Sequence, residues 1–447
     1  MNKVMKMNSR ELALKILLEY EKAESYSNLL LDSELKKVEL SELDKAFVTK
    51  LVYGVIAYIR TLDYIISKMS KVRVKKISKP IINILRLGVY QIYYLDKVPN
   101  SAVVNESVKL AKKYGHQASA NFVNALLRNV GKKQKDDFFV EIKDQKGKLA
   151  VYYSYPDWVV DLFIEQYGIE RTKDILKANE AELIDCIRVN TLKNTRGELL
   201  EKLDEFDVKE GRTEDIIYTK DIKRLLMSNY FKEGLFTVQD EAPSLVGHII
   251  NPKEGDKILD ICAAPGGKTT HLAQLSNDKA EITAFELHEH RCKLIENLCV
   301  RLGIKSIKVE QRDATIFDEK LIEKFDKIVA DVPCSGLGVI RRKPDIKWNT
   351  KAEDIENLIK IQYQILSNAG KYLKKGGILI YSTCTNNRKE NDDIVNRFLE
   401  ENKEFEIGEI NNIPEDFVKD VYNKGMLELS PDKNNCDGFF ICVLHRM

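Results

Sequence analysis

The segment at residues 258–272, ILDICAAPGGKTTHL, restricts the possible folds of this chain more than any other. A short apolar run ends at Cys262, a turn of small residues follows, and Lys268 opens a stretch of helical character. This order predicts a strand, a tight loop and a helix. Glycines let a ligand approach the backbone, and the start of a helix offers unpaired N–H groups. We therefore expect a nucleotide-like cofactor at this loop.

Two well-known cofactor loops do not match the segment. The phosphate-binding pattern G-x-x-x-x-G-K-[ST] requires glycine at position 262, where this chain has Cys262. The dinucleotide pattern G-x-G-x-x-G is absent as well. The loop thus indicates a cofactor without identifying it, and a purely structural turn is the alternative interpretation.

Strands and helices alternate from residue 256 to the end of the chain. This alternation predicts a mostly parallel, doubly wound sheet with ligands at the carboxyl ends of its strands. A long helix is expected near residues 352–373, broken by Gly376 and Gly377. The expected strands are residues 258–262, 282–286, 306–309, 327–331, 378–382 and 439–445.

The first third of the chain is helical and basic. Apolar residues recur at helical spacing and predict a compact bundle. Residues 1–140 hold 25 Lys and Arg against 14 Asp and Glu, although the whole chain has a net charge of only +2. The loop KMSKVRVKKISK at residues 68–79 has six basic residues and no acid. This distribution favours a polyanionic partner, with a solvated lysine-rich surface as the alternative.

A length of 447 residues suggests about three domains. We expect a helical domain at residues 1–132, a polar linker at 133–148, a small α+β domain at 149–238 and an α/β domain at 239–447. Eight scattered cysteines without a C-x-x-C pair indicate reduced thiols and no metal site. No long apolar run or signal region is present, so we expect a cytoplasmic protein without a membrane segment.

Three acidic residues lie at or after the ends of predicted strands. Glu286 ends the second strand about 20 residues after the glycine loop, where a carboxylate can accept both hydroxyls of a cofactor ribose. Asp313 follows the third strand at a position suited to an adenine edge, and Asp331 ends the fourth. Helix capping is the alternative role for each residue taken singly.

Two cysteines follow the fourth and fifth strands. Cys334 lies in the segment DVPCSG and Cys384 in YSTCT. Because these strands should be neighbours in an open sheet, the two thiols should meet beside Asp331 and form a candidate nucleophilic site. Such a pair suits pyrimidine chemistry, because carbon 5 of the ring is a poor nucleophile until a thiolate adds at carbon 6.

The front of the chain resembles the NusB-like RNA-binding domain, which is all-helical. The residues that carry the likeness are SRELALKILLEYE at 9–21, DKAFVTKLVYGVIAYIRTLDYII at 44–66 and VPNSAVVNESVKLAKKYGHQASANFVNALLRNV at 98–130. The likeness covers roughly the first 130 residues and is specific in its last segment.

The remainder resembles RNA 5-methylcytosine methyltransferases of the RsmB/Sun type, in the NOL1/NOP2/Sun group. The matching segments are ICAAPGGKTTHLA at 261–273, VADVPCSGLGVIRRKPDIKW at 329–348, YSTCT at 381–385 and DGFF at 437–440. The resemblance implies a multidomain fold: an all-α NusB-like bundle, a small α+β (RRM-like) domain and an α/β Rossmann-like class I methyltransferase domain. It also implies S-adenosyl-L-methionine as cofactor.

The resemblance implies a role for each matching residue. Cys384 would be the nucleophile, Cys334 would assist release of the methylated RNA, and Asp331 would face the cytosine. The cofactor would be held by Cys262, Ala263, Ala264, Pro265, Gly266, Gly267, Lys268, Glu286, Asp313 and Asp331. A basic and aromatic flap would bind RNA through Arg341, Arg342, Lys343, Lys347 and Trp348.

These features together predict a monomeric enzyme that methylates carbon 5 of one cytosine in 16S rRNA, in an unpaired loop. The resemblance points to the cytosine commonly numbered 967. A methyltransferase acting on tRNA or another RNA is the first alternative. An NAD-dependent oxidoreductase lacks the G-x-G-x-x-G loop and leaves the thiol pair unexplained, and a non-catalytic RNA-binding assembly factor has no use for those thiols.

Overall fold

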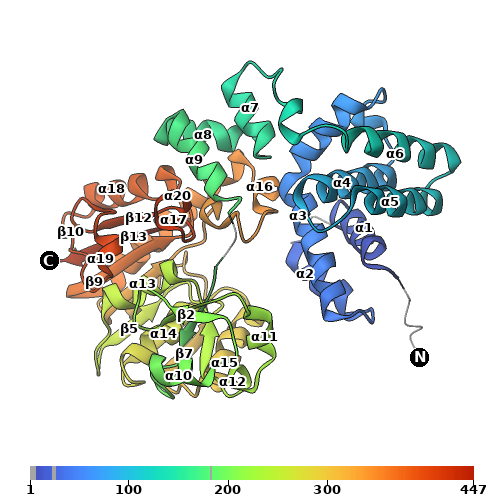
Figure 1. Cartoon of the computed structure of the whole chain (residues 1–447). Coiled ribbons are helices and arrows are strands. Elements are labelled where there is room, and N and C mark those ends of the chain that lie inside the picture. The colour runs from blue at the N-terminus through green and yellow to red at the C-terminus, as the bar shows by residue number, and fades with distance from the viewer. Residues whose placement is uncertain (1–6, 23–26, 182–183) are drawn as a thin grey trace. The chain divides into compact units, whose positions relative to one another are not determined.

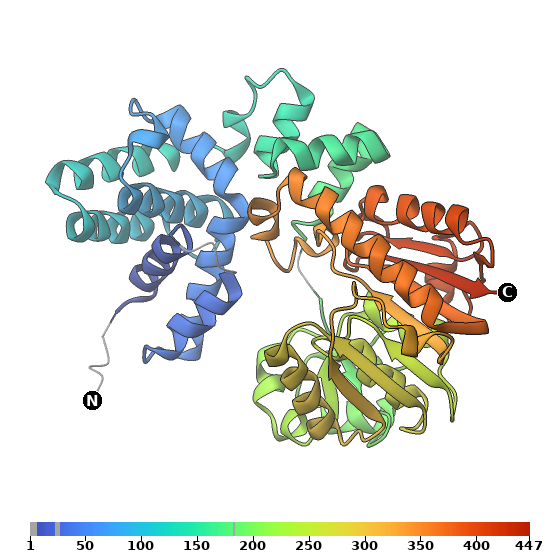
Figure 2. The same cartoon turned by 180° about the vertical axis from the view of Figure 1, so that it is seen from behind.

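The computed structural model describes residues 7–22, 27–181 and 184–447, and the chain forms two compact units. The first unit contains Met1–Leu176 together with Lys343–Asn349, and the second contains Lys177–Arg342 and Thr350–Met447. Figures 1 and 2 show the elements of each unit from opposite sides. No helix in the described ranges is long and apolar enough to cross a membrane.

The first unit is helical, and the predicted helical bundle is confirmed. Leu, Ile and Val side chains of its helices form one buried core. The helices are α1 (Ser9–Tyr20), α2 (Ser27–Lys36), α3 (Glu42–Met69), η1 (Val74–Lys76), α4 (Lys79–Tyr94), α5 (Asn100–Tyr114), α6 (Gln117–Val130) and α8 (Asp157–Tyr167). Ser41 accepts a hydrogen bond from Asp44 N at the start of α3, and Pro80 lies in the first turn of α4.

Residues 133–148, expected as a polar linker, include η2 (Lys135–Phe138) and the start of α7 (Gln145–Tyr152). Phe138 and Phe139 are buried in the core of the bundle. Phe138 and Phe139 are the only aromatic residues within the charged run KKQKDDFFVEIKDQKGK. Their burial fixes the position of this segment against the bundle.

The small domain contains a four-stranded antiparallel sheet with strand order β2-β3-β1-β4. Ile187, Leu199, Ile217 and Phe236 are fully buried in its core. α9 (Ile169–Ala178) leads into the domain from the first unit. The elements are β1 (Asp185–Val189), α10 (Arg196–Lys202), β2 (Val208–Glu210), β3 (Ile216–Thr219), α11 (Ile222–Met227), α12 (Asn229–Lys232) and β4 (Phe236–Val238).

The α/β domain, for which the resemblance predicts a methyltransferase, is built on a nine-stranded sheet of order β11-β12-β13-β9-β8-β5-β6-β7, with β10 paired to β13. The strands are β5 (Lys257–Asp260), β6 (Glu281–Glu286), β7 (Ile307–Gln311), β8 (Phe325–Asp331), β9 (Leu373–Thr383), β10 (Phe405–Ile407), β11 (Val421–Tyr422), β12 (Met426–Leu429) and β13 (Phe439–Arg446). The helices are α13 (Glu241–Ile250), α14 (Gly267–Leu275), α15 (Glu289–Leu302), α17 (Ala352–Tyr372), α18 (Asp392–Glu401), α19 (Glu415–Val418) and α20 (Pro431–Asn434).

The Rossmann-like prediction is confirmed, but the sheet is mixed and not mostly parallel. β5 to β9 pair in parallel, whereas β13 runs antiparallel to β9 and to β12. The helix expected near residues 352–373 is confirmed as α17, but β9 begins at Leu373 and includes Gly376 and Gly377, so these glycines do not separate the helix from the strand. β8 and β9 are neighbours, as expected, so their carboxyl ends share one edge of the sheet.

Candidate active site

The predicted cofactor loop joins β5 to α14. Gly266 has a φ of +104°, and a Cβ at this position would meet the side chains of Ile295 and Leu298 at 3.3 Å. Both the backbone conformation and the available space therefore require glycine. The predicted loop residues Cys262, Ala263, Ala264, Pro265 and Gly266 form this turn, and Gly267 begins α14.

A buried acid lies beneath the loop. Thr269 Oγ1 donates to Asp260 Oδ2 at 2.6 Å and ties the first turn of α14 to the end of β5. Burial raises the pKa of Asp260 to about 6. Burial also raises the pKa of Cys262 well above that of a free thiol, so this cysteine stays protonated and belongs to the loop's packing.

Two of the three acidic residues predicted at strand ends, Glu286 and Asp313, form hydrogen bonds with residues close to them in the sequence. Glu286 Oε1 accepts from His288 N at 2.9 Å, and Arg291 pairs with its other oxygen at 3.2 Å. Asp313 Oδ1 accepts from Thr315 N and Thr315 Oγ1 at 2.9 and 2.6 Å. Glu286 ends β6 and Asp313 follows β7, as predicted, and both carboxylates also fix the turn that comes next.

Asp331, the last residue of β8, links the first turn of α14 to β9. Its Oδ2 atom accepts from Lys268 Nζ at 2.7 Å, and its Oδ1 atom accepts from Ser382 Oγ at 2.8 Å. Lys268 also lies over the ring of Phe439, 5.1 Å from its centroid. Lys268, in the first turn of α14, therefore contacts both Asp331 at the carboxyl end of β8 and Phe439 of β13.

The two predicted thiols lie together. Cys334 Sγ and Cys384 Sγ are 3.3 Å apart, on loops that follow β8 and β9. The hydrogen bond with Cys384, followed by burial, raises the pKa of Cys334 well above that of a free thiol. Two thiols at this distance can share one proton, so ionisation of one sulfur is stabilised by the S–H group of the other.

The predicted RNA-binding flap is divided between the two units. Arg341 and Arg342 belong to the second unit, where Asp437 accepts from both arginines. Arg342 also pairs with Asp240 at 3.1 Å and with Asp185 at 3.2 Å. The Arg341 side chain is only 3% exposed. These two guanidinium groups therefore connect the segment after Cys334 to β13 and to the small domain.

The other flap residues belong to the first unit. Lys347 Nζ donates to Ala57 O at 2.6 Å, and Trp348 Nε1 donates to Ile56 O at 2.7 Å, so α3 accepts both bonds. Lys343 is exposed. RNA binding by the flap stays a prediction, and four of its five residues have partners within the protein.

Arg188 of the small domain contacts α14, the helix that follows the predicted cofactor loop. This side chain is fully buried and donates to Gly267 O at 2.7 Å and to Thr270 Oγ1 at 3.1 Å, both in the first turn of α14. Its Nε atom donates to Gln274 Oε1 at 3.0 Å. Sequence reasoning did not single out Arg188, although an arginine inside the apolar strand IRV was the available signal.

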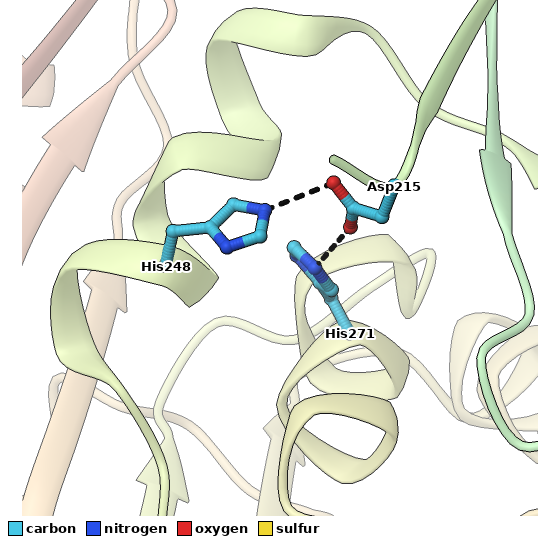
Figure 3. Close-up of side chains that lie close together, drawn as sticks. All are labelled: Asp215, His248 and His271. Carbon is cyan, nitrogen blue, oxygen red and sulfur yellow. Dashed lines mark hydrogen bonds and ion pairs between the residues drawn. The ribbon is translucent and has the colours of Figure 1, made fainter. Parts of the chain in front are cut away.

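A carboxylate between two imidazoles lies in the same region (Figure 3). Asp215 Oδ1 bonds His248 Nε2 at 2.9 Å, and Asp215 Oδ2 lies 2.6 Å from His271 Nε2. The three side chains have a spacing that could hold a metal ion. The Asp215 carboxylate also interacts electrostatically with the buried Arg188. Burial lowers the pKa of His271 to about 4, which keeps its imidazole neutral.

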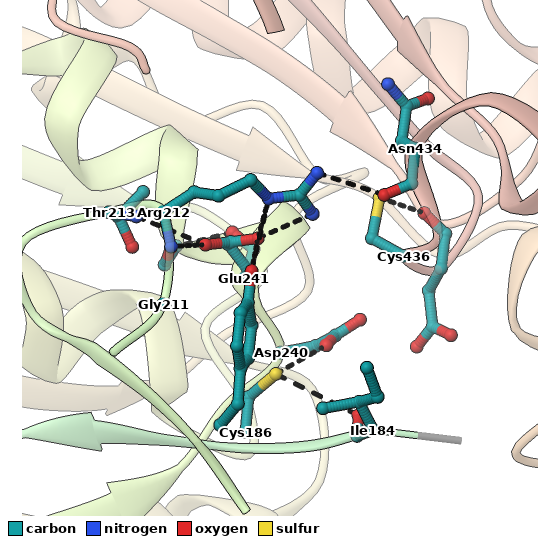
Figure 4. A network of polar contacts seen from close by, with 12 residues as sticks. Ile184, Cys186, Gly211, Arg212, Thr213, Asp240, Glu241, Asn434 and Cys436 are labelled. Atoms are coloured by element: carbon teal, nitrogen blue, oxygen red, sulfur yellow. Dashed lines mark hydrogen bonds and ion pairs between the residues drawn. The ribbon is translucent and has the colours of Figure 1, made fainter. Parts of the chain in front are cut away.

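A second polar network joins the small domain to the start of α13 (Figure 4). Glu241 accepts from the backbone N–H groups of Arg212 and Thr213 at 2.7 and 3.1 Å and pairs with the Arg212 guanidinium at 2.7 Å. Cys186 Sγ donates to Asp240 Oδ1 at 3.2 Å. Because these groups are largely buried, the small domain and the methyltransferase domain are fixed together within the second unit.

Family models match three successive parts of the chain. The model for 16S rRNA methyltransferase RsmB/F matches residues 247–445, the NusB family model matches residues 7–132, and a ferredoxin-like domain of RsmF/B-like methyltransferases matches residues 155–216. The last match identifies the type of the small α+β domain.

Curated proteins of known sequence are similar over almost the whole chain. A probable ribosomal RNA small subunit methyltransferase B of Bacillus subtilis (strain 168) is 38% identical over 99% of each chain. A protein of the same name from Synechocystis sp. is 34% identical, over 98% of this chain and 100% of its own. The crystal structure of PH0851 shares the fold, with a TM-score of 0.81 over 99% of this chain and 100% of its own at 24% identity.

Proposed function

The chain belongs to the RsmB/F family of 16S rRNA methyltransferases, and we propose that it forms 5-methylcytosine in that RNA with S-adenosylmethionine as methyl donor. The observation that carries the proposal is the thiol pair, in which Cys334 Sγ and Cys384 Sγ lie 3.3 Å apart after neighbouring strands. Transfer to an RNA hydroxyl or amine needs no cysteine nucleophile, whereas transfer to carbon 5 of a pyrimidine does.

Cys384 is the nucleophile in this proposal. Its thiolate adds to carbon 6 of the cytosine, and the electron pair of the 5,6 double bond moves to carbon 5, which becomes nucleophilic. Asp331, which ends β8 on the same edge of the sheet, faces the ring near N3 and stabilises the adduct. The Lys268 ammonium group pairs with Asp331 and holds this carboxylate at the edge.

S-adenosylmethionine, when bound, supplies an electrophilic methyl group to carbon 5. Residues 262–268 would hold it, with Glu286 at the ribose and Asp313 at the adenine. The loop has room for a ligand, because a Cβ added at Gly267 would find no atom closer than 3.8 Å. The first N–H groups of a helix have no carbonyl partner within it, so the start of α14 favours a ligand with a carboxylate.

Release restores the aromatic ring. The proton at carbon 5 passes to a water molecule near Asp331, the bond between Cys384 Sγ and carbon 6 breaks, and its electron pair returns to the sulfur. Cys334 assists by donating its proton to the departing Cys384 sulfur, which lies within hydrogen-bonding distance.

The substrate is an unpaired cytosine, because the reacting atoms must leave the base stack to reach Cys384. The position commonly numbered 967 is the proposed address. The NusB-like domain selects the RNA through its exposed basic loop at residues 68–79. A tRNA substrate is the alternative, and substrate profiling with 16S rRNA and tRNA separates the two.

The test is transfer of labelled methyl from S-adenosylmethionine to 16S rRNA by the wild type, Cys384→Ala and Cys334→Ala, with denaturing gels to detect protein bound to RNA. We expect methylation by the wild type, none by Cys384→Ala, and a trapped RNA adduct with Cys334→Ala. Cys299→Ala, which removes a buried thiol of α15, is the matched control and should methylate normally.

Two outcomes would contradict the proposal. If Cys384→Ala still methylates and Cys334→Ala neither reacts nor traps RNA, the two thiols have the opposite roles. If the wild type transfers methyl to no RNA, the chain is a binding factor and the thiol pair has no catalytic role.

A further inference from the structure

Glu390 is a buried carboxylate between the two cysteine loops. It ends η5 (Arg388–Glu390), and its relative exposure is 0%. Among the residues that the structure describes, no lysine, arginine or histidine forms an ion pair with it. An anion buried without a cation is costly unless hydrogen bonds compensate for the lost solvation, so the position of this carboxylate needs an explanation.

The carboxylate holds the loop that carries Cys334 directly at Ser335, and through Gln362 at Pro333. Ser335 N donates to Oε1 at 2.8 Å, and Ser335 Oγ donates to Oε2. Gln362 Nε2 donates to Oε1 at 3.0 Å and also to Pro333 O at 2.9 Å. The residues before and after Cys334 are therefore fixed relative to the Glu390 charge.

The next residue, Asn391, holds the other cysteine loop in a corresponding way. Thr383 Oγ1 donates to Asn391 Oδ1 at 2.6 Å, and Asn391 Nδ2 donates to Thr385 O at 2.9 Å. The Ser335 and Thr385 hydroxyls lie 2.9 Å apart and join the two loops. The adjacent pair Glu390 and Asn391 thus sets the separation of the two sulfur atoms.

The two loops differ in charge. Ser335, the residue directly after Cys334, donates twice to the Glu390 carboxylate, whereas the neutral amide of Asn391 holds the Cys384 loop at Thr383 and Thr385. A nearby anion disfavours a thiolate. The titratable groups that face Cys334 are Cys384, Glu390 and Tyr381, and the Glu390 charge contributes to the raised pKa of Cys334, after the hydrogen bond with Cys384 and burial.

We propose that Glu390 divides the roles of the two thiols. Its negative charge beside Cys334 keeps the proton on that sulfur, so that Cys384 carries the negative charge of the pair and attacks the cytosine. The Cys334 S–H group then donates to the Cys384 thiolate. Glu390 touches neither substrate nor cofactor, so it is a positioning residue. The inference rests on the proposed function and adds the reason why one thiol ionises before the other.

The test measures which thiol reacts first in the full-length protein without RNA or S-adenosylmethionine. Iodoacetamide alkylation of Cys334 and Cys384 is followed separately by peptide mass spectrometry between pH 6 and 10. We expect Cys384 to react at least about tenfold faster than Cys334 in the wild type. In Glu390→Gln the ratio of the two rates should fall by about tenfold, because each unit of pKa changes the thiolate population tenfold.

Two controls separate charge from structure. Ser335→Ala removes a hydrogen bond from the network and keeps the carboxylate, so the ratio should stay within about twofold of the wild type. Glu400→Gln removes an exposed carboxylate of α18 and should leave the ratio unchanged. An equal change in Glu390→Gln and Ser335→Ala would assign the effect to loop geometry and overturn the inference.

The wild-type measurement is decisive even if Glu390→Gln fails to fold, because faster alkylation of Cys334 than of Cys384 would overturn the inference directly. The methylation assay stays independent. Methylation through Cys384, with an alkylation ratio that Glu390→Gln does not change, would reject the role of Glu390 and leave the proposed function intact. The reverse result would reject the function and keep the charge effect.

Discussion

Two basic stretches of this chain look alike in sequence and differ in structure. In residues 68–79 all six basic side chains are exposed, and Lys68 forms an ion pair with an exposed glutamate, Glu141. In the flap, Arg341, Arg342 and Lys347 are largely withdrawn from solvent, on backbone carbonyls or buried carboxylates. A run of positive charge therefore shows that cations are present, and only the fold decides whether they face solvent or hold the chain together.

The sharpest test of this difference is Asp437→Ala. Removing the carboxylate leaves the buried Arg341 and the partly buried Arg342 without their shared partner, and breaking a buried pair costs about 3 kcal/mol or more. We expect a fall of this size in the free energy of unfolding of the second unit, measured in urea. Glu356→Ala, an exposed carboxylate of α17, is the control and should change stability by less than about 0.5 kcal/mol. Equal stability of the two variants would show that the flap arginines are free for RNA.

The flap should also give a measurable pH dependence. Burial and the nearby Asp240 raise the pKa of Asp437 to about 6, against about 3.9 in the unfolded chain. The folded state binds this proton more tightly, so the stabilisation is complete below about pH 4 and is lost as the pH rises through 6. Relative to Asp437→Asn, the wild type should lose about 2 kcal/mol between pH 4 and 7. Parallel stability curves for the two proteins would contradict the raised pKa.

Trp348→Phe tests the aromatic end of the flap. The change removes the donor to Ile56 O and leaves that carbonyl without its partner, which should destabilise the first unit by about 1 kcal/mol. Thermal unfolding measures the loss. Trp158→Phe, the other tryptophan of the chain, is the control. A loss of RNA affinity without any loss of stability would show that Trp348 faces RNA, as the sequence suggests.

Lys75→Ala with Lys76→Ala should have the smallest effect on stability, within about 0.5 kcal/mol, because both side chains are exposed. RNA affinity should fall, and the slope of log affinity against log salt should decrease by about 1.4 for two lost phosphate contacts to single-stranded RNA. Filter binding over a range of salt concentrations measures both. Lys112→Ala with Lys143→Ala, also exposed, is the charge-matched control. An equal loss of RNA affinity in both double variants would show that the loop contributes only general charge attraction.

The edge of the sheet that carries the thiol pair was more predictable than the contact between the small domain and the methyltransferase domain. Asp331, Cys334 and Cys384 follow the ends of neighbouring strands, and parallel strands bring such ends together whatever the details of packing. Arg188 and Glu390 were not predicted, because their partners lie at α14 and at the Cys334 loop, far away in the sequence. No local sequence pattern predicts which buried polar groups will form hydrogen bonds with each other.

The sequence by itself determined the helical front, the Rossmann-like core, the cofactor loop and the meeting of Cys334 with Cys384. These features follow from local periodicity, turn residues and the shared edge of parallel strands. Only the tertiary structure decided that β13 runs antiparallel, that Arg341 and Arg342 are tied to Asp437, and that Glu390 lies on the side of Cys334. The physical reason is that a buried charge is tolerated only where distant residues supply its partners, and that supply depends on the completed fold.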